Sequence, residues 1–162
     1  TYTTQDLYNN EIHPSGSSIE NGYDATLEEV LHLITQNGYA YAYPTVFGES
    51  KGSTIAGYMD TARGGYYESV PATYPDEAWY HYDDATCDYR CMAIEYLYWA
   101  QVTQMGILND PETCQGIANE WEPCSPELLE SMDPLVYALI TDPQYKLPQS
   151  APDGIYGPAA AP

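Results

Sequence analysis

A carboxylate and an imidazole stand four residues apart in the segment TLEEVLHLIT, residues 26–35. On a helix, Glu28 and His32 would lie one turn apart on the same face, where their oxygen and nitrogen atoms can share a divalent cation. Glu29 would then stand beside the ion, in a position to polarise a bound water. A second interpretation involves no ion: Thr26 and Glu29 have the spacing of a capping box, and Glu28 and His32 that of a solvated pair.

A further acidic residue, Glu95, lies in the apolar segment CMAIEYLYWA, residues 91–100. Its neighbours one turn away on a helix would be apolar or aromatic: Cys91, Met92, Tyr98 and Trp99. A carboxylate on such a face is costly unless it binds a cation or accepts hydrogen bonds. We therefore predict Glu95 as a third metal ligand, with Arg63, Arg90 or a tyrosine hydroxyl as the alternative partner.

Together these residues resemble the active-site skeleton of the gluzincins, zinc peptidases whose H-E-x-x-H helix precedes a helix that supplies a glutamate ligand. The resemblance covers only residues 26–36 and 87–105, and Glu28 replaces the first motif histidine. It implies that Glu28, His32 and Glu95 hold a divalent metal and that Glu29 is the catalytic base. Zinc is the first choice, and the oxygen-rich set would also accept manganese, iron or calcium. The changed ligand implies weak or absent peptide hydrolysis.

The loop DEAWYHYDDATCD, residues 76–88, is dense in hard oxygen ligands, which suit calcium. Asp83 and Asp84 are candidate calcium ligands there, and His81 is a candidate for the same ion or for a fourth ligand at the main site. The spacing does not match an EF-hand loop. The alternative is a solvated acidic loop in which Asp84 or Thr86 caps the next helix.

The charge balance is strongly negative, with 24 acidic residues, 4 basic residues and a formal net charge of −20. Phosphates would be repelled, so we expect neither nucleic acid nor an anionic membrane surface as a partner. No stretch approaches the roughly 20 apolar residues of a membrane-spanning helix. The composition is instead suited to cations.

The four cysteines favour two local disulfides, Cys87–Cys91 and Cys114–Cys124, although a metal site is an alternative for the first pair. Disulfides indicate an oxidising compartment. The chain begins at Thr1 and shows no signal-like run, so we expect an extracellular protein whose signal has been removed.

Aromatic residues are mostly tyrosine, with 18 Tyr against a single Phe, and they suit half-wet surfaces. They could bind glycans or pack as an amphipathic core. Residues 147–162 form a Pro/Ala/Gly-rich tail that we expect to dock on its own or a neighbouring chain. These features support an alternative function, a structural extracellular protein that self-assembles as a fibre or coat subunit, or a carbohydrate-binding module.

Periodicity and capping signals predict a mainly α-helical fold of five or six helices, with long Tyr/Pro-rich loops and at most a small β-sheet. Residues 1–25 are expected to be irregular, 26–146 to form one globular domain, and 147–162 to be extended. Helices are predicted over 26–36, 54–63 and 87–105 and after Asp110, Ser125 and Asp133, with Ser53 or Thr54 as the cap of the second. The segment YAYAYPTVF, which starts at residue 39, is predicted as a strand or extended edge that ends at Pro44. The predicted core comprises Leu31, Ile34, Ile94, Leu97, Val102, Leu135, Val136, Leu139 and Ile140.

Overall fold

The computed structural model of this 162-residue chain describes residues 4–12 and 24–151. These residues are mainly helical, and none of them forms a β-strand. The helices are a 3₁₀ helix (Asn9–Glu11), α1 (Thr26–Ile34), a π-helix (Thr35–Tyr39), α2 (Ala40–Ala42), α3 (Pro44–Phe47), α4 (Thr54–Ala62), α5 (Tyr89–Gln104), α6 (Pro111–Ile117), α7 (Pro126–Met132) and α8 (Pro134–Ile140). The prediction of a mainly α-helical fold is confirmed.

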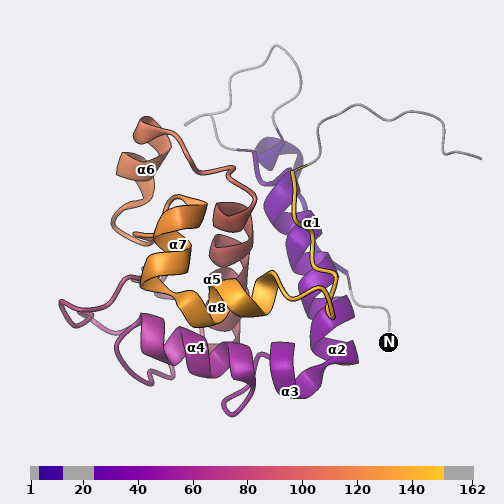
Figure 1. The fold of residues 1–162 in the computed structure, drawn as a ribbon, viewed down its shortest axis with the longest axis horizontal. Coiled ribbons are helices and arrows are strands. Elements are labelled where there is room, and N and C mark those ends of the chain that lie inside the picture. The colour runs from indigo at the N-terminus through magenta and orange to yellow at the C-terminus, as the bar shows by residue number, and fades with distance from the viewer. Residues whose placement is uncertain (1–3, 13–23, 152–162) are drawn as a thin grey trace, which may run out of the picture.

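Helix α5 is the centre of the fold, and α1, α4, α7 and α8 all pack against it (Figure 1). It begins at Tyr89 because the side chain of Asp88 caps it by accepting a hydrogen bond from the Cys91 amide at 3.0 Å. The prediction that Asp84 or Thr86 is the cap was wrong. Asp84 instead accepts hydrogen bonds from the amide and hydroxyl of Thr86, which closes a local turn.

Four other helices begin at capping side chains that the sequence indicated. Ser53 caps α4, while Asp110, Ser125 and Asp133 cap α6, α7 and α8, each immediately before a proline in the last three cases. Both predicted disulfides, Cys87–Cys91 and Cys114–Cys124, are present, with Cα separations of 5.4 and 5.5 Å. The first disulfide joins the start of α5 to the loop before it.

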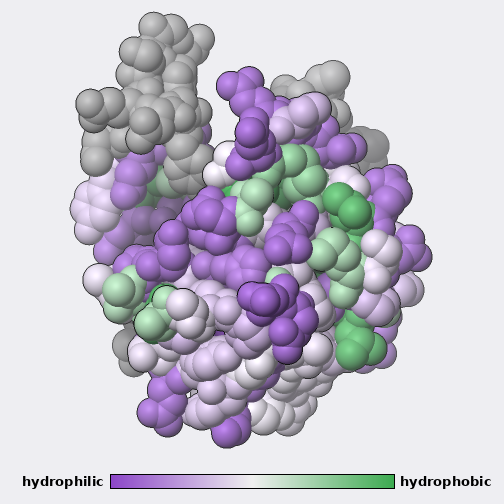
Figure 2. All heavy atoms as spheres, turned by 90° about the vertical axis from the view of Figure 1, so that its left-hand side faces the viewer, coloured by the Kyte–Doolittle hydropathy of each residue, from purple (hydrophilic) through white to green (hydrophobic). Residues whose placement is uncertain are grey.

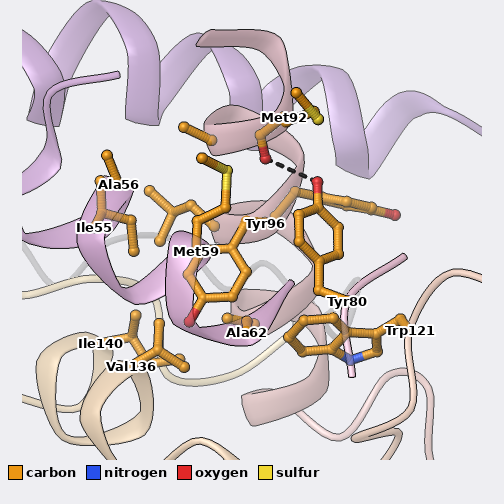
Figure 3. Packing of buried hydrophobic residues seen from close by; sticks show 14 of the residues in the cluster. Ile55, Ala56, Met59, Ala62, Tyr80, Met92, Tyr96, Trp121, Val136 and Ile140 are labelled. Carbon is orange, nitrogen blue, oxygen red and sulfur yellow. Dashed lines mark hydrogen bonds between the residues drawn. The ribbon is translucent and has the colours of Figure 1, made fainter. Parts of the chain in front are cut away.

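The core mixes aliphatic and aromatic side chains, and the fully buried Tyr and Trp residues find partners inside it for their polar groups (Figure 3). The fully buried Tyr80 donates a hydrogen bond from its hydroxyl to the Met92 carbonyl at 2.8 Å. The indole of Trp121 donates to Thr103 Oγ1, also at 2.8 Å. Tyrosine therefore replaces phenylalanine as a core residue here, because each buried hydroxyl is satisfied.

The predicted core was right for most of its members. The buried ones are Leu31, Leu97, Val102, Val136 and Ile140, and Ile94 and Leu139 are partly buried. The prediction was wrong for Ile34 and Leu135, which are 37% and 54% exposed. Helix α8 is apolar nearly all round, so composition could not decide which of its faces packs inward.

The prediction of a strand or extended edge from Tyr39 to Pro44 was also wrong. The chain stays helical beyond residue 36, passing from α1 through the π-helix into α2, and α3 follows after Tyr43. The aromatic residues that suggested a strand pack as a cluster, with Tyr39, Phe47 and Tyr145 meeting edge to face at centroid separations of 5.0 to 5.5 Å. Tertiary packing overrides the local strand preference here.

The segment after α8 packs on the same chain, beside the π-helix and α5. Leu147 is 3% exposed, and the Tyr39 hydroxyl lies 2.9 Å from the carbonyl oxygens of both Tyr145 and Lys146, to which it can donate. The side-chain amide of Gln101 in α5 donates to the Pro148 carbonyl. Residues 147–149 are therefore docked, residues 150–151 are exposed, and the rest of the predicted tail, 152–162, lies outside the described residues.

Replacing Tyr39 by phenylalanine tests this docking. The Tyr39→Phe variant should lose about 1 kcal/mol of unfolding free energy, because the two carbonyl groups lose their shared donor while the ring stays in its cluster. Urea denaturation measures the loss. The matched control is Tyr41→Phe, whose side chain is 87% exposed, and equal stability of the two variants would contradict the prediction.

The surface is polar over much of the face in Figure 2, where hydrophobic residues form small, separate groups among hydrophilic ones. This agrees with the high net negative charge, −20. No helix in the described part of the chain is long and apolar enough to span a bilayer.

Candidate metal centre between α1 and α5

Helix α1 buries a polar strip and exposes apolar residues. Ile34 was predicted to lie in the core but is 37% exposed, and the apolar Val30 and Leu33 of the same helix are 46% and 42% exposed. The buried residues of α1 are Leu31 and His32. This arrangement breaks the usual rule for an amphipathic helix, and such breaks are expected where a site is built.

His32 is the buried centre of this strip. His32 is only 4% exposed, so the prediction of a solvated Glu28–His32 pair was wrong. Its Nε2 atom lies 3.5 Å from Glu95 Oε2, and its Nδ1 atom lies 3.8 Å from Glu29 Oε2. The 3.5 Å contact with Glu95 is long for a hydrogen bond, and Nε2 has no other hydrogen-bond partner. A buried ring nitrogen without a hydrogen bond is costly unless another group binds it.

The carboxylates of α1 converge on this imidazole. One potential ligand atom from each of Glu28, Glu29 and His32 lies within 4.8 Å of the other two. Among the described residues, no other set of three or more His, Cys, Asp or Glu side chains comes this close together. Glu95 approaches from α5. Two ligands of a tetrahedral zinc ion, each about 2.1 Å from the metal, are about 3.4 Å apart. The 3.5 Å between His32 Nε2 and Glu95 Oε2 matches that separation.

The capping box predicted for Thr26 and Glu29 does not form. Ala25 is the N-cap of α1, and the Thr26 amide donates to the side chain of Asp24 at 2.8 Å. Glu29 instead accepts a hydrogen bond from the side-chain amide of Gln5. Residues 4–12 thus lie against the start of α1 and restrain the carboxylate beside His32 Nδ1.

Burial and crowding of like charges set the protonation of the cluster. Burial, reinforced by the Glu95 carboxylate, raises the pKa of Glu28 to about 7. For His32, burial lowers the pKa, but the carboxylates of Glu95, Glu28 and Glu29 more than offset it, so the net shift is upward. A cation among these groups would stabilise their charged carboxylates.

The basic residues of the chain are engaged elsewhere. Arg63 pairs with Asp60 at 2.7 Å, and Arg90 pairs with Glu49 at 2.6 Å. The arginine partners considered for Glu95 are therefore not seen. Lys51 lies over the ring of Tyr66, 3.5 Å from its centroid. His32 is therefore the basic residue that lies among these carboxylates.

A pocket of about 360 Å³ opens beside the cluster. Residues of helices α1 and α5 line one side of the pocket. Tyr82 and the residues at and just after the end of α6 line the other side. Tyr98 joins pocket and cluster, because its ring meets the His32 ring edge on at 5.6 Å. The lining residues are Glu28, Tyr82, Glu95, Tyr98, Trp99, Gly116, Ile117, Asn119 and Glu120.

The other predicted ligands do not join the cluster. His81 packs edge to face with Tyr74, with ring centroids 5.5 Å apart. Asp83 accepts a long hydrogen bond from Asn119 at 3.4 Å, and Asp84 is used in its turn with Thr86. These three residues do not share one place for an ion in the described structure.

Sequence reasoning missed Glu120 and Asn119 as pocket residues. Burial, and next the neighbouring Asp83 carboxylate, raise the pKa of Glu120 to about 7. The sequence offers a weak signal, an acid beside the buried Trp121 in the segment IANEWEPC. That signal does not indicate which cavity the side chain faces.

The fold and site together define a mainly α-helical, disulfide-bonded protein with a carboxylate–histidine cluster at a pocket. Comparisons with protein-family models, curated protein sequences and solved structures give no match to this chain. Any functional conclusion therefore depends on the site itself.

Proposed function

We propose that this protein binds one divalent cation between α1 and α5, with Glu28, His32 and Glu95 as ligands. The observation that carries the proposal is the imidazole of His32, which is 4% exposed, has no hydrogen bond at Nε2 and is surrounded by carboxylates. A cation would satisfy Nε2 and offset the repulsion between the acidic groups. A mixed nitrogen and oxygen ligand set suits zinc, and manganese, iron or calcium are the alternatives.

Glu29 is proposed to position the imidazole. Its Oε2 atom lies beside Nδ1, on the opposite side of the ring from the nitrogen that faces Glu95. Carboxylates commonly hold the second nitrogen of a metal-bound histidine in this way. The sequence suggested Glu29 as a catalytic base. In the structure Glu28 lines the pocket, whereas the Glu29 carboxylate accepts a hydrogen bond from Gln5. This placement supports cation binding with weak or no peptide hydrolysis.

An extracellular location is part of the proposal. It is supported by the two disulfides and by the high net negative charge, −20, which suits a cation-rich medium. The cation site itself does not depend on the location.

The alternative functions remain predictions, with less support. Self-assembly through the tail depended on a docked segment, and residues 147–149 of that segment pack on their own chain. Glycan binding depended on the aromatic loop, where Tyr80 is fully buried and Trp79 donates a hydrogen bond to Asp133. An open apolar groove remains beside the π-helix, lined by Leu33, Ile34, Asn37, Gly38, Tyr39, Ala42, Tyr43, Tyr145 and Lys146.

Elemental analysis of the purified protein tests the proposed function. We expect about one divalent ion per chain, and metal-stripped protein should take up one equivalent of added Zn²⁺ or another of the named ions. The Glu95→Gln variant should bind that ion at least about tenfold more weakly, because a neutral amide is a poorer ligand than a carboxylate. Isothermal titration calorimetry measures the difference.

The matched control is Glu130→Gln on the exposed face of α7, which should bind like the wild type. Glu29→Gln separates a positioning role from a ligand role, because its loss should be smaller than that of Glu95→Gln. Absence of any stoichiometric ion, together with no uptake by the stripped protein, would refute the proposed function.

A further inference from the structure

The pocket beside the cation site has acidic residues and aromatic rings as its main groups. Its acidic side chains are those of Glu28 and Glu95 at one side and Glu120 at the other. The rings are those of Tyr82, Tyr98 and Trp99. A volume of about 360 Å³ is within the range of small-ligand sites.

The two acidic sides of the pocket differ in what they can bind. Glu28 and Glu95 stand against His32, whose buried Nε2 has no hydrogen bond, so this side suits a metal ion. The carboxyl group of Glu120 lies near Asp83, which accepts a hydrogen bond from Asn119 at 3.4 Å. The Glu120 carbonyl accepts a hydrogen bond from the His81 amide at 2.7 Å. A carboxylate next to aromatic rings suits an ammonium or guanidinium group, which donates hydrogen bonds to the carboxylate and can lie over a ring face.

Aromatic faces strengthen this preference. A cation placed over the face of a Trp or Tyr ring is attracted by the electron density of the ring. Trp99 is held in place by stacking on the buried Trp121, with an interplanar angle of 16° and centroids 6.5 Å apart. A rigid ring loses little entropy when it binds a ligand.

We propose that this pocket binds an organic cation, the guanidinium or ammonium group of an arginyl or lysyl side chain, with Glu120 as its counter-ion and Trp99 and Tyr82 as its aromatic walls. The proposal rests on the proposed function, since the pocket shares Glu28 and Glu95 with the cation site. It names the ligand class of that site as a basic peptide side chain.

Calorimetry with a matched pair of probes tests this proposal. N-acetyl-arginine amide and N-acetyl-citrulline amide have nearly the same shape, and only the first is charged. We expect the metal-loaded protein to bind the arginine derivative at least tenfold more tightly than the citrulline derivative. N-acetyl-lysine amide, titrated in parallel, shows whether the guanidinium or the ammonium group is preferred.

The Glu120→Gln variant should lose this discrimination and keep its metal content, while the exposed Glu122→Gln serves as control. Equal binding of the arginine and citrulline derivatives, no binding of either, or unchanged discrimination in Glu120→Gln would overturn the proposal. The same titrations on metal-stripped protein separate the two proposals. Discrimination that depends on Glu120 in stripped protein supports the pocket whether or not a metal binds, and only a failure to take up metal would in addition refute the cation site.

Discussion

The His32→Ala variant should bind the divalent cation at least about 100-fold more weakly than the wild type. Loss of an outer-shell partner alone typically costs 10–100-fold in metal affinity, and His32 is proposed as a direct ligand. It is the single nitrogen donor in the cluster, placed 3.5 Å from Glu95 Oε2. The remaining carboxylates would have to hold the ion without it.

Thermal and chemical stability report the same loss independently. At a free metal concentration 1,000 times the dissociation constant, the wild type should gain about 4 kcal/mol of unfolding free energy. At the same concentration a 100-fold weaker variant should gain only about 1.4 kcal/mol. The comparison is made between loaded and stripped samples of each protein. Any change in packing from the substitution itself therefore cancels.

His81→Ala is the matched control. His81 is the other histidine among the described residues, and it packs on Tyr74 rather than joining the cluster. This variant should retain the full metal-dependent gain. If His32→Ala gains as much stability from metal as the wild type, His32 is a buried structural residue and the cation site does not exist as proposed.

The helices could be predicted because their signals are local. Asp110, Ser125 and Asp133 each cap a helix within a few residues of the chain, so no distant contact is needed to place the helix start. The prediction of a strand from Tyr39 to Pro44 failed for the opposite reason. The ring of Tyr43 packs on Tyr145, far along the sequence, and no local pattern encodes that contact.

The site was predictable only in part. Spacing identified Glu28, Glu29 and His32 as one group, and an isolated acid in an apolar helix identified Glu95, and the structure brings these four together. The sequence pattern gave the buried face of α1 only in part, because it assumed that apolar residues face inward. Leu31 is buried as predicted, but Ile34 is exposed and His32 is buried. Glu120 was missed because it reaches the pocket through the tertiary fold.

The second large effect is expected at a buried ion pair outside the site. Arg63 at the end of α4 has no exposed surface, and its guanidinium lies 2.7 Å from Asp60 Oδ1. It also lies over the rings of Tyr67 and Tyr89, while the Tyr89 hydroxyl donates to the other Asp60 oxygen at 3.1 Å. Asp60 is thus the carboxylate that neutralises this buried charge.

The Asp60→Asn variant should lose about 3 kcal/mol of unfolding free energy, measured by urea denaturation. Removal of one partner from a buried pair costs roughly 3–5 kcal/mol, because the other charge is left uncompensated. The lower end is expected because the Asp60 side chain is 23% exposed, so water already screens part of its attraction for the guanidinium. A loss below about 1 kcal/mol would show that the pair behaves like a surface salt bridge.

A double variant separates the loss of attraction from the cost of the stranded charge. Asp60→Asn combined with Arg63→Met removes both charges and keeps an unbranched apolar side chain of comparable length in the space between Tyr67 and Tyr89. If the stranded charge dominates, the double variant should be more stable than Asp60→Asn alone and should recover more than half of its loss. If the double variant is the less stable of the two, the aliphatic stem and ring contacts of Arg63 contribute more than its charge costs, because arginine packs as well as pairs.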